Sequence, residues 1–506
     1  MIHRLPIERA CLLTGSLLAC VPLVAQQRPH IILLMADQHR FDALGCMGND
    51  AVQTPNLDAL ASDGTTFMHA YSSTPSSTPA RAGLLTGLSP WHHGMLGYGR
   101  VGGEYRFEMP RMLRQLGYYT FGVGKMHWFP QHALHGFHAT LIDESGRVES
   151  PDFISDYRRW FQLHAPGQDP DKTGIGWNDL RAGTYQLPEE LHPTVWTGET
   201  ACELIRNYDD ERPLFLKVSF ARPHSPYDPP QRFIDFYDGQ EIPAPYAGDW
   251  AESHAALKEP TQQNTRSPYG NYGDDYARNS RRHYYANVTF VDEEIGKVVA
   301  ALREKGMYDN ALIIYISDHG DMLGDHYYWR KTYPYEGSAH IPFIVKWPAS
   351  WHVQVGGKDT HPVELRDVLP TFLETAGGVV PEEMDGRSLV SLVTGDSNVR
   401  WRDYIDLEHS TCYVSENYWC ALTDGRIKYV WNFYDGHEEL FDLEKDPCEL
   451  KELSGEPAYR TILESMRFRM VRHLSERGED FVKDGRLVVR GKDTMLYGPL
   501  YPGAAE

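Results

Sequence analysis

Cysteine, positive charge and long apolar segments are all scarce in this chain of 506 residues. Seven cysteines are few for a disulfide framework, and no Cys-x-x-Cys spacing indicates a zinc site. Lys and Arg number 49 against 70 Asp and Glu, which gives a formal net charge of −21. Such a deficit argues against nucleic acid as a partner, because phosphate neutralisation needs clustered basic residues. An anionic ligand would have to be attracted by a local basic pocket.

The apolar stretch at the N-terminus is too short to span a membrane comfortably. Arg4 and Arg9 precede the apolar residues 10–25, as in an export signal, with cleavage expected after Ala25. An alternative is a lipoprotein box that would place a lipid anchor on Cys20. We therefore expect residues 1–25 to be a signal peptide, and the protein to be exported to the periplasm or held at the cell surface as a lipoprotein, with no membrane span.

Five cysteines remain after removal of such a signal, and an odd number cannot all pair internally. Cys412 and Cys420 could form a bridge if they were adjacent in space. Buried free thiols are the favoured alternative.

Strand-like and helix-like segments alternate over most of the chain, which is typical of an α/β core with a mostly parallel sheet. Near-continuous apolar runs predict buried strands at 30–36, 120–124, 214–220 and 311–316. Periodic apolar residues predict a long helix over 280–305. Residues 225–285 are rich in Pro, Asp, Tyr and Asn and predict a long excursion over the surface.

Short alternating strands replace this pattern near the C-terminus. They are predicted at 418–422, 427–432 and 439–442, followed by a helix around 458–477. The length of the chain also favours two domains. We place a large domain at 26–395 and a smaller α+β domain with an antiparallel sheet at 396–506.

The segment Ser77-Thr78-Pro79-Ala80-Arg81 places a hydroxyl where a helix is expected to begin. Proline suits the first turn of a helix, and Ser77 or Thr78 suits the cap before it. The free N–H groups of a helix N-terminus attract anions, and Arg81 adds a full positive charge. This pattern favours a tetrahedral oxyanion such as sulfate or phosphate.

Polar residues follow each of the four predicted strands. In open α/β sheets, ligands bind at the carboxyl ends of the strands, so these residues should lie close together. They are Asp37-Gln38, Lys125-x-His127, His224 and Asp318-His319.

The segment from Ser77 to Arg81, with the small-residue run that ends at Thr86-Gly87, resembles the (Cys/Ser)-x-Pro-x-Arg signature of type I sulfatases. With the strand-end residues, the resemblance extends from Pro29 to about Asp446. It implies the alkaline phosphatase fold: a large mixed, mostly parallel sheet flanked by helices, which makes 26–395 the catalytic domain, and a smaller C-terminal domain with an antiparallel sheet.

In this family the first residue of the signature is oxidised to formylglycine, whose hydrate provides the attacking hydroxyl. The resemblance therefore implies a modified Ser77 and a maturation enzyme that produces it. Serine at this position resembles family members matured by a radical enzyme, although an engineered replacement of cysteine would give the same sequence.

The resemblance also implies a metal site and its ligands. Oxygen ligands suit a hard cation, so Ca²⁺ is the first choice. His319 stands where the commonest family pattern has Asn, and an imidazole suits Mn²⁺ or Zn²⁺ better. Alternatively, His319 does not bind the metal itself but forms a hydrogen bond to a residue that does. The implied ligands are Asp37, Gln38, Ser77, Asp318 and His319.

In family members, charged residues at matching positions carry out the catalysis. The resemblance implies that Arg81 and Lys125 form the positive surroundings of residue 77 and that Lys331 contacts the sulfate. His224 protonates the leaving oxygen and His127 takes a proton from the hydrate, roles that near-neutral pKa values would permit.

Substrate contacts are expected from residues close to these positions in the sequence. Aromatic and basic groups suit a charged sugar. The candidates are Trp128, Arg222, Tyr227, His326, Arg330 and His409.

Together these features predict an exo-acting sulfatase for a glycosaminoglycan or mucin-type saccharide. A phosphonate or phosphate ester hydrolase of the same superfamily is the enzymatic alternative. A catalytically silent glycan-binding protein is the alternative from another class.

Overall fold

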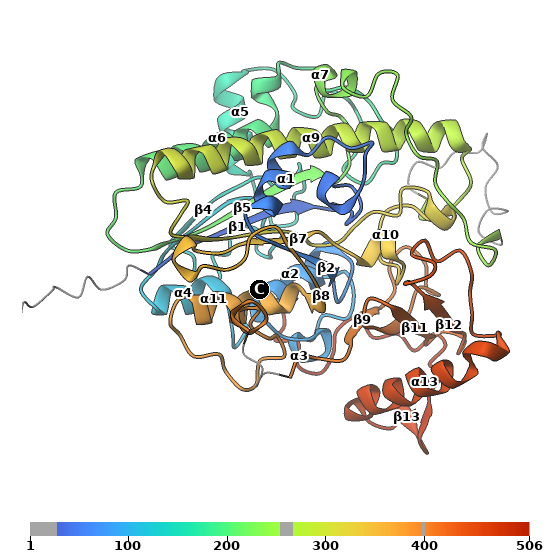
Figure 1. Cartoon of the computed structure of the whole chain (residues 1–506). Coiled ribbons are helices and arrows are strands. Elements are labelled where there is room, and N and C mark those ends of the chain that lie inside the picture. Colours follow the sequence, from blue (N-terminus) through green and yellow to red (C-terminus); the bar gives the residue numbers. More distant parts are fainter. Residues whose placement is uncertain (1–27, 253–266, 396–399, 505–506) are drawn as a thin grey trace, which may run out of the picture.

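The structure is a computed structural model that describes residues 28–252, 267–395 and 400–504. The predicted signal peptide and the lipoprotein box at Cys20 lie outside the described residues. Most of the chain surrounds one large mixed sheet, and the C-terminal part of the sequence forms a smaller antiparallel sheet with one long helix, at the lower right of Figure 1. The predicted fold class is confirmed. The predicted domain boundary near residue 395 falls beside residues 396–399, which are not described, and stays a prediction.

The large sheet has eight strands in the order β4-β3-β5-β1-β6-β7-β2-β8. All neighbouring strands are parallel except for β7, which runs antiparallel to both β6 and β2. The strands are β1 (His30–Asp37), β2 (Thr65–Tyr71), β3 (Tyr119–Gly124), β4 (Ala139–Ile142), β5 (Leu214–Pro223), β6 (Ala311–Ser317), β7 (Phe343–Lys346) and β8 (Gly357–Glu364).

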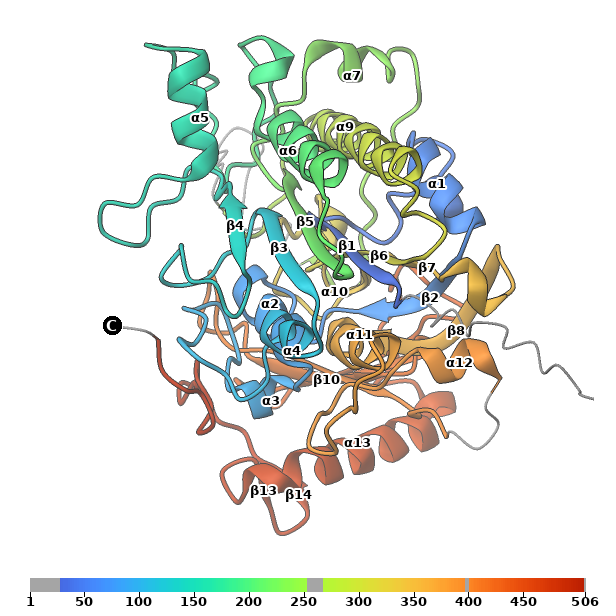
Figure 2. The same cartoon turned by 90° about the vertical axis from the view of Figure 1, so that its left-hand side faces the viewer.

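The central strand β1 is buried on both faces, as its apolar run predicts. Ile31, Leu33 and Met35 belong to the core on one face, and the alternate residues belong to the core on the other. Figures 1 and 2 show helices covering both faces of the sheet. One face carries α1 (Pro55–Ser62), α6 (Pro193–Asn207) and α9 (Asp274–Glu304); the other carries α2 (Ser77–Thr86), α4 (Met109–Gln115) and α11 (Val368–Thr375).

Shorter helices lie in the segments between these elements. Among them α5 and α7 lie at the top of Figure 1, on the side of α9. They are α3 (Pro90–His93), α5 (Asp156–His164), α7 (Gln231–Asp235), α10 (Glu336–Ala339) and α12 (Val390–Thr394).

The small sheet has the order β12-β11-β10-β9, with every pair antiparallel. One of its faces packs against α13 (Arg460–Leu474) through a separate apolar cluster. Its strands are β9 (Ile405–His409), β10 (Trp419–Thr423), β11 (Ile427–Asn432) and β12 (Glu438–Asp442), and a two-stranded ribbon of β13 (Val482–Lys483) and β14 (Arg486–Leu487) follows α13.

Two helix starts differ from the sequence-based expectation. The long helix α9 begins at Asp274, six residues earlier than expected, because Asp274 and Asp275 place negative charge in the first turn, where the helix dipole favours it. Helix α2 already includes Ser77, and its cap is Ser76, whose side chain makes no capping hydrogen bond. The expected cap at Ser77 or Thr78 is thus shifted by one residue or more.

The expectation of buried free thiols is confirmed for Cys202 and Cys420, whereas Cys46, Cys412 and Cys448 are free but only partly buried. Cys46, Cys202, Cys412, Cys420 and Cys448 are all unpaired, so the possible bridge between Cys412 and Cys420 is not formed. Among the described helices, none combines the length and apolar character that a membrane crossing requires.

A buried ion-pair network joins the small sheet to the large domain. Lys428 of β11 is fully buried, and its Nζ lies 2.6 Å from Glu336 Oε1 and 2.8 Å from Glu449 Oε1. Glu336 also contacts His340 Nδ1 at 2.6 Å. One lysine therefore balances two buried carboxylates from opposite sides of the junction.

Replacing Lys428 with Met should destabilise the protein strongly. The variant keeps the apolar part of the side chain but leaves the carboxylates of Glu336 and Glu449 without their shared cation. Breaking a buried pair in this way costs about 3–5 kcal/mol. The free energy of unfolding from urea titration measures the effect.

Lys445→Met is the matched control, because the Lys445 side chain is 73% exposed and pairs with Asp442 at the surface. Its effect should stay within about 0.5 kcal/mol. Equal effects of the two substitutions would show that the junction does not depend on the buried lysine.

Candidate active site

The four strands that were expected to carry functional residues lie side by side in the order β3-β5-β1-β6. All four are parallel, so their carboxyl ends meet at one edge of the sheet. Asp37 ends β1, Lys125 follows β3 directly, and Asp318 follows β6. The topology thus gathers residues that are far apart in the sequence.

Arg81 of α2 connects two of these strand ends. Its Nε donates to Asp318 Oδ2 at 2.9 Å, and its Nη2 donates to Asp37 Oδ2 at 3.0 Å. Its Nη1 donates to the backbone oxygen of Lys125 at 2.7 Å and to Ser219 Oγ at 3.2 Å. The guanidinium is fully buried and holds the start of α2 against the edge of the sheet.

Ser77 is the first residue of α2, and its hydroxyl lies 3.1 Å from His319 Nε2. The preceding residue, Ser76, pairs its own hydroxyl with His409 Nε2 at 2.8 Å. Because Ser76 is the cap, the Ser77 side chain is free to lie among the strand-end residues. It stands at a helix N-terminus, where negative charge is favoured.

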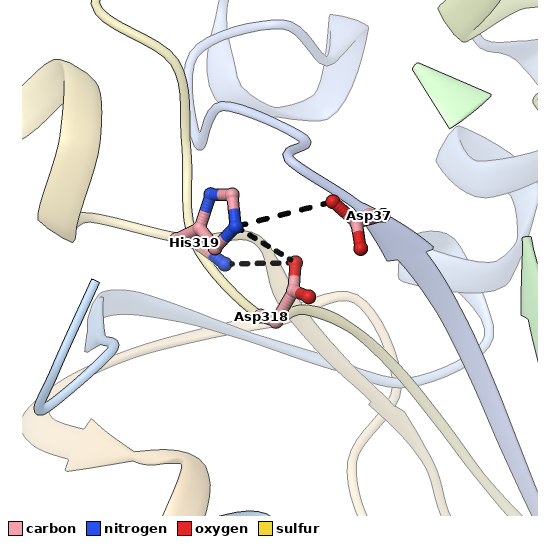
Figure 3. Close-up of side chains that lie close together, drawn as sticks. All are labelled: Asp37, Asp318 and His319. Atoms are coloured by element: carbon pink, nitrogen blue, oxygen red, sulfur yellow. Dashed lines mark hydrogen bonds and ion pairs between the residues drawn. The ribbon is translucent and has the colours of Figure 1, made fainter. Parts of the chain in front are cut away.

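Asp37, Asp318 and His319 form a cluster whose ligand atoms lie within 4.8 Å of one another (Figure 3). His319 Nε2 lies 3.9 Å from Asp37 Oδ1 and 3.7 Å from Asp318 Oδ1. His319 Nδ1 donates to the Gly320 oxygen at 2.9 Å, which leaves the lone pair of Nε2 directed at the cluster. Asp37 Oδ1 is buried and has no hydrogen-bond partner among the described residues. Two carboxylates and one imidazole with these free positions fit a divalent cation.

Gln38 does not offer a free oxygen in this arrangement. Its Oε1 accepts a hydrogen bond from Lys331 Nζ at 2.6 Å, and its Nε2 donates to Asp321 Oδ2 at 2.5 Å. Its backbone N–H donates to Asp318 Oδ1 at 3.0 Å. Gln38 thus links the expected metal ligands to the lysine expected to contact sulfate.

Lys331 also donates to His224 Nε2 at 2.8 Å, while His224 Nδ1 donates to the Ser225 oxygen at 2.8 Å. His224 is therefore a neutral imidazole here, and the proton resides on Lys331. Burial and the charges of Lys331 and Lys125 lower the pKa of His224 well below its usual value, and burial lowers the pKa of Lys331 to about 8.

His127 lies next to Arg147, whose Nη1 contacts His127 Nδ1 at 3.1 Å. Burial, together with the charges of Arg147 and Lys125, lowers the pKa of His127 well below its usual value. The near-neutral pKa values expected for His127 and His224 are thus not found, because both rings are buried among cations.

Lys125 and Asp37 pair at 2.5 Å between Nζ and Oδ2. Burial opposes the ionised form of Asp37, but the positive groups around it, Lys125 first, hold its pKa well below the usual range. Burial and Arg147 lower the pKa of Lys125 to about 8. The strand ends therefore hold an ionised carboxylate among several cations.

Two residues expected to touch substrate have other partners. Trp128 is 2% exposed and packs against Phe137 in the core, with Lys217 Nζ 5.4 Å from its ring. His326 is buried against Trp250 and accepts from the Gly248 N–H at 3.0 Å. These rings belong to the packing of the fold, because both have apolar partners away from the strand ends.

Arg222 and Tyr227 are also engaged elsewhere. Arg222 donates twice to Asp228 Oδ1, at 3.1 and 2.9 Å, and Tyr227 donates to Asp321 Oδ2 at 2.6 Å. Arg222 lines a cavity of about 200 Å³ together with Trp177 and Asp228.

Arg330 and His409 are buried as well. The Arg330 guanidinium lies over the Tyr413 ring at 4.5 Å, and His409 is fully buried against Ser76. In the structure His409 thus contacts the residue next to Ser77 and has no face exposed toward a substrate.

Three residues of the site were not found by sequence reasoning. Tyr98 lies with its hydroxyl 3.5 Å from His127 Nε2, Arg147 contacts the same ring, and Asp321 binds Gln38. Asp321 is only two residues beyond His319, a signal that could have been used. Arg147 lies in a loop after β4 that has no recognisable pattern.

A sequence model of the Sulfatase family matches residues 29–379, and one described as N-sulphoglucosamine sulphohydrolase, C-terminal, matches residues 324–476. The arylsulfatase of Clostridium perfringens is 36% identical over 481 residues, covering 92% of this chain and 98% of the relative. The choline-sulfatase of Rhizobium meliloti is 33% identical over 454 residues, covering 85% and 83%.

Among solved structures, the phosphonate monoester hydrolase of Agrobacterium radiobacter superposes with a TM-score of 0.75 at 25% identity, covering 89% of this chain and 96% of that one. The family match covers most of the chain, and it includes every strand end described above. The chain thus belongs to the sulfatase family of the alkaline phosphatase superfamily and is a sulfuric ester hydrolase.

Proposed function

We propose that this protein removes sulfate from carbohydrates, as an exo-acting sulfatase for a glycosaminoglycan or mucin-type saccharide. The observation that carries the proposal is the position of Ser77. Its hydroxyl stands at the N-terminus of α2, 3.1 Å from His319, beside the cluster of Asp37 and Asp318. Helix N–H groups and nearby cations there suit a sulfate group.

The proposed chemistry includes a formylglycine at Ser77 and a divalent metal, with Ca²⁺ as the first choice and Mn²⁺ or Zn²⁺ as alternatives. Asp37, Asp318 and His319 would hold the metal, and Gln38 would join them as a ligand if its oxygen also turned a lone pair from Lys331 toward the metal. A bound metal supplies positive charge that withdraws electrons from sulfate oxygens, and the hydrated aldehyde supplies a nucleophilic hydroxyl.

The surrounding residues bind the sulfate and move protons. Arg81 fixes the carboxylates, and the ammonium groups of Lys125 and Lys331 neutralise negative charge that develops in the reaction. In this proposal Lys331 Nζ transfers a proton to His224 Nε2, which becomes an imidazolium and then donates that proton to the leaving oxygen, leaving Lys331 neutral. His127, beside Lys125, would accept a proton from residue 77.

Carbohydrate as the substrate class is supported by the family match over residues 324–476, whose description names N-sulphoglucosamine. Polar and aromatic groups near His127 also suit a sugar: Tyr98 contacts the ring of His127, and Arg147 lies 5.2 Å from the ring of Trp177. A phosphonate ester hydrolase is the second candidate, because the solved enzyme with that activity has a similar fold.

Export and maturation complete the proposal. A signal within residues 1–25 would deliver the protein to the periplasm, or to the cell surface if Cys20 carries a lipid. A formylglycine-generating enzyme would modify Ser77 beforehand.

A panel of defined sulfated mono- and disaccharides should reveal one saccharide that is desulfated faster than choline sulfate or 4-nitrocatechol sulfate. Release of inorganic sulfate measures turnover, and Ser77→Ala is the inactive control. An aryl phosphonate belongs in the same panel. Faster turnover of the phosphonate than of any sulfate ester would contradict the proposal.

Mass spectrometry of the peptide around Ser77, from protein made in its native host, should show the loss of two hydrogen atoms. This is the mass change from serine to formylglycine. An intact serine in active native protein would refute the modification, and an intact serine in inactive native protein would favour a silent glycan-binding role.

Replacing His224 with Ala should reduce kcat/KM by about 10²–10⁴-fold for a sugar sulfate, because general acid catalysis is lost. The loss should be much smaller for 4-nitrophenyl sulfate, whose leaving group needs little protonation. His361→Ala, at an exposed histidine paired with Asp359, should leave both rates unchanged. Equal losses on both substrates would remove His224 from the acid role.

A further inference from the structure

Asp321 is a fully buried carboxylate that accepts four hydrogen bonds. Oδ1 accepts from the backbone N–H groups of Leu323 and Arg330, both at 3.0 Å. Oδ2 accepts from Gln38 Nε2 at 2.5 Å and from the Tyr227 hydroxyl at 2.6 Å. These contacts tie together the end of β1 and the loop that carries Arg330 and Lys331.

The contacts of Gln38 give its amide a defined direction. Its nitrogen faces the Asp321 carboxylate, and its oxygen faces the Lys331 ammonium at 2.6 Å. The two ends of an amide have nearly the same shape, so packing alone does not distinguish them, whereas their hydrogen-bond partners do. A carboxylate accepts only, and an ammonium donates only, so this orientation alone satisfies both ends.

The backbone conformation of Gln38 indicates that holding its side chain in this position costs conformational energy. Its φ is 66°, a left-handed value that is uncommon for residues other than glycine. Such conformations persist where surrounding contacts enforce them, and they are concentrated at functional sites. Here the backbone N–H donates to Asp318, and the side chain spans from Asp321 to Lys331.

We infer that Asp321 is a positioning residue that sets the polarity of the Gln38 amide and thereby keeps an oxygen, and not an N–H group, facing Lys331 and the reactive cluster. Asp321 itself makes no hydrogen bond to Lys331 or Ser77, so its hydrogen-bonded link to Lys331 runs through Gln38, while its negative charge also favours the Lys331 ammonium through space. The reversed amide would direct N–H groups at an ammonium, leaving Lys331 with His224 Nε2 as its one remaining acceptor of the two described.

Replacing Asp321 with Asn tests this inference directly. The new side-chain oxygen would stay with the N–H groups of Leu323 and Arg330, so its NH₂ group would face Gln38. The Gln38 amide must then reverse and present its own NH₂ group to Lys331. We expect kcat/KM for a sulfate ester to fall by about tenfold or more, together with a lower unfolding temperature.

Gln38→Glu tests the same contact from the other side. A carboxylate at position 38 would lie against the carboxylate of Asp321, so this single substitution should also lower both the activity and the unfolding temperature. In the double variant Asp321→Asn/Gln38→Glu, the new amide donates to the new carboxylate, which again offers an oxygen to Lys331. The double variant should exceed both single variants in both measurements.

Asp325→Asn is the matched control. Asp325 lies in the same loop, is equally buried and accepts from Arg40 Nη1 at 2.7 Å, but it does not contact Gln38. Its effect should add to that of Gln38→Glu, with no rescue. Additive losses for the Asp321 and Gln38 substitutions, or a double variant that fails to fold, would overturn the inference.

The activity measurement rests on the proposed function, whereas the unfolding temperature does not. The unfolding temperatures are measured with the purified protein after treatment with a chelator, so they require neither substrate nor metal. If the unmodified sequence turns over no sulfate ester, the proposed function fails, but rescue of the unfolding temperature would still support the assigned polarity. Rescue of neither quantity would overturn it.

Discussion

The paired bonds of the Arg81 guanidinium are the interaction on which the site depends most. Asp37 and Asp318 end neighbouring strands, and two buried carboxylates so close together would repel each other without a shared cation. Removing one partner from such a group costs about 3–5 kcal/mol. Because Arg81 lies one turn into α2, the same bonds also fix the start of that helix, and with it Ser77. Ser77 and the carboxylate cluster are therefore held by one side chain.

Much of this arrangement could be predicted from the sequence, because it follows from buried strands. Apolar runs identify β1, β3, β5 and β6, and parallel strands bring their carboxyl ends to one edge. The fixed backbone of such a strand restricts the directions in which the side chain at its end can point. Asp37, Lys125 and Asp318 were therefore placed by the hydrophobic pattern alone, and the small antiparallel sheet followed from alternation and turns in the same way.

Side chains whose direction depends on tertiary partners could not be predicted. Trp128 follows His127 directly, but His127 has a φ of 60°, and the Trp128 ring packs in the core against Phe137. Arg222 lies two residues before His224, but its guanidinium pairs with Asp228. Proximity in the sequence to a residue of the candidate site is thus weak evidence for contact with substrate. Arg147 could not be predicted for the same reason, because its contact with His127 exists only when the loop after β4 lies against His127.

The balance of charge at the strand ends explains how an acidic protein can attract an anion. The two oxygens of Asp37 have different surroundings: Oδ2 contacts both Arg81 and Lys125, whereas Oδ1 has no hydrogen-bond partner among the described residues. A divalent cation at Oδ1, as proposed, would complete the pairing of the carboxylates. With Lys331 included, the positive charge at the strand ends would then exceed the negative charge of the carboxylates. The long-range field of a chain with a net charge of −21 is screened within about 10 Å at moderate salt, so this local excess decides which ligand is held.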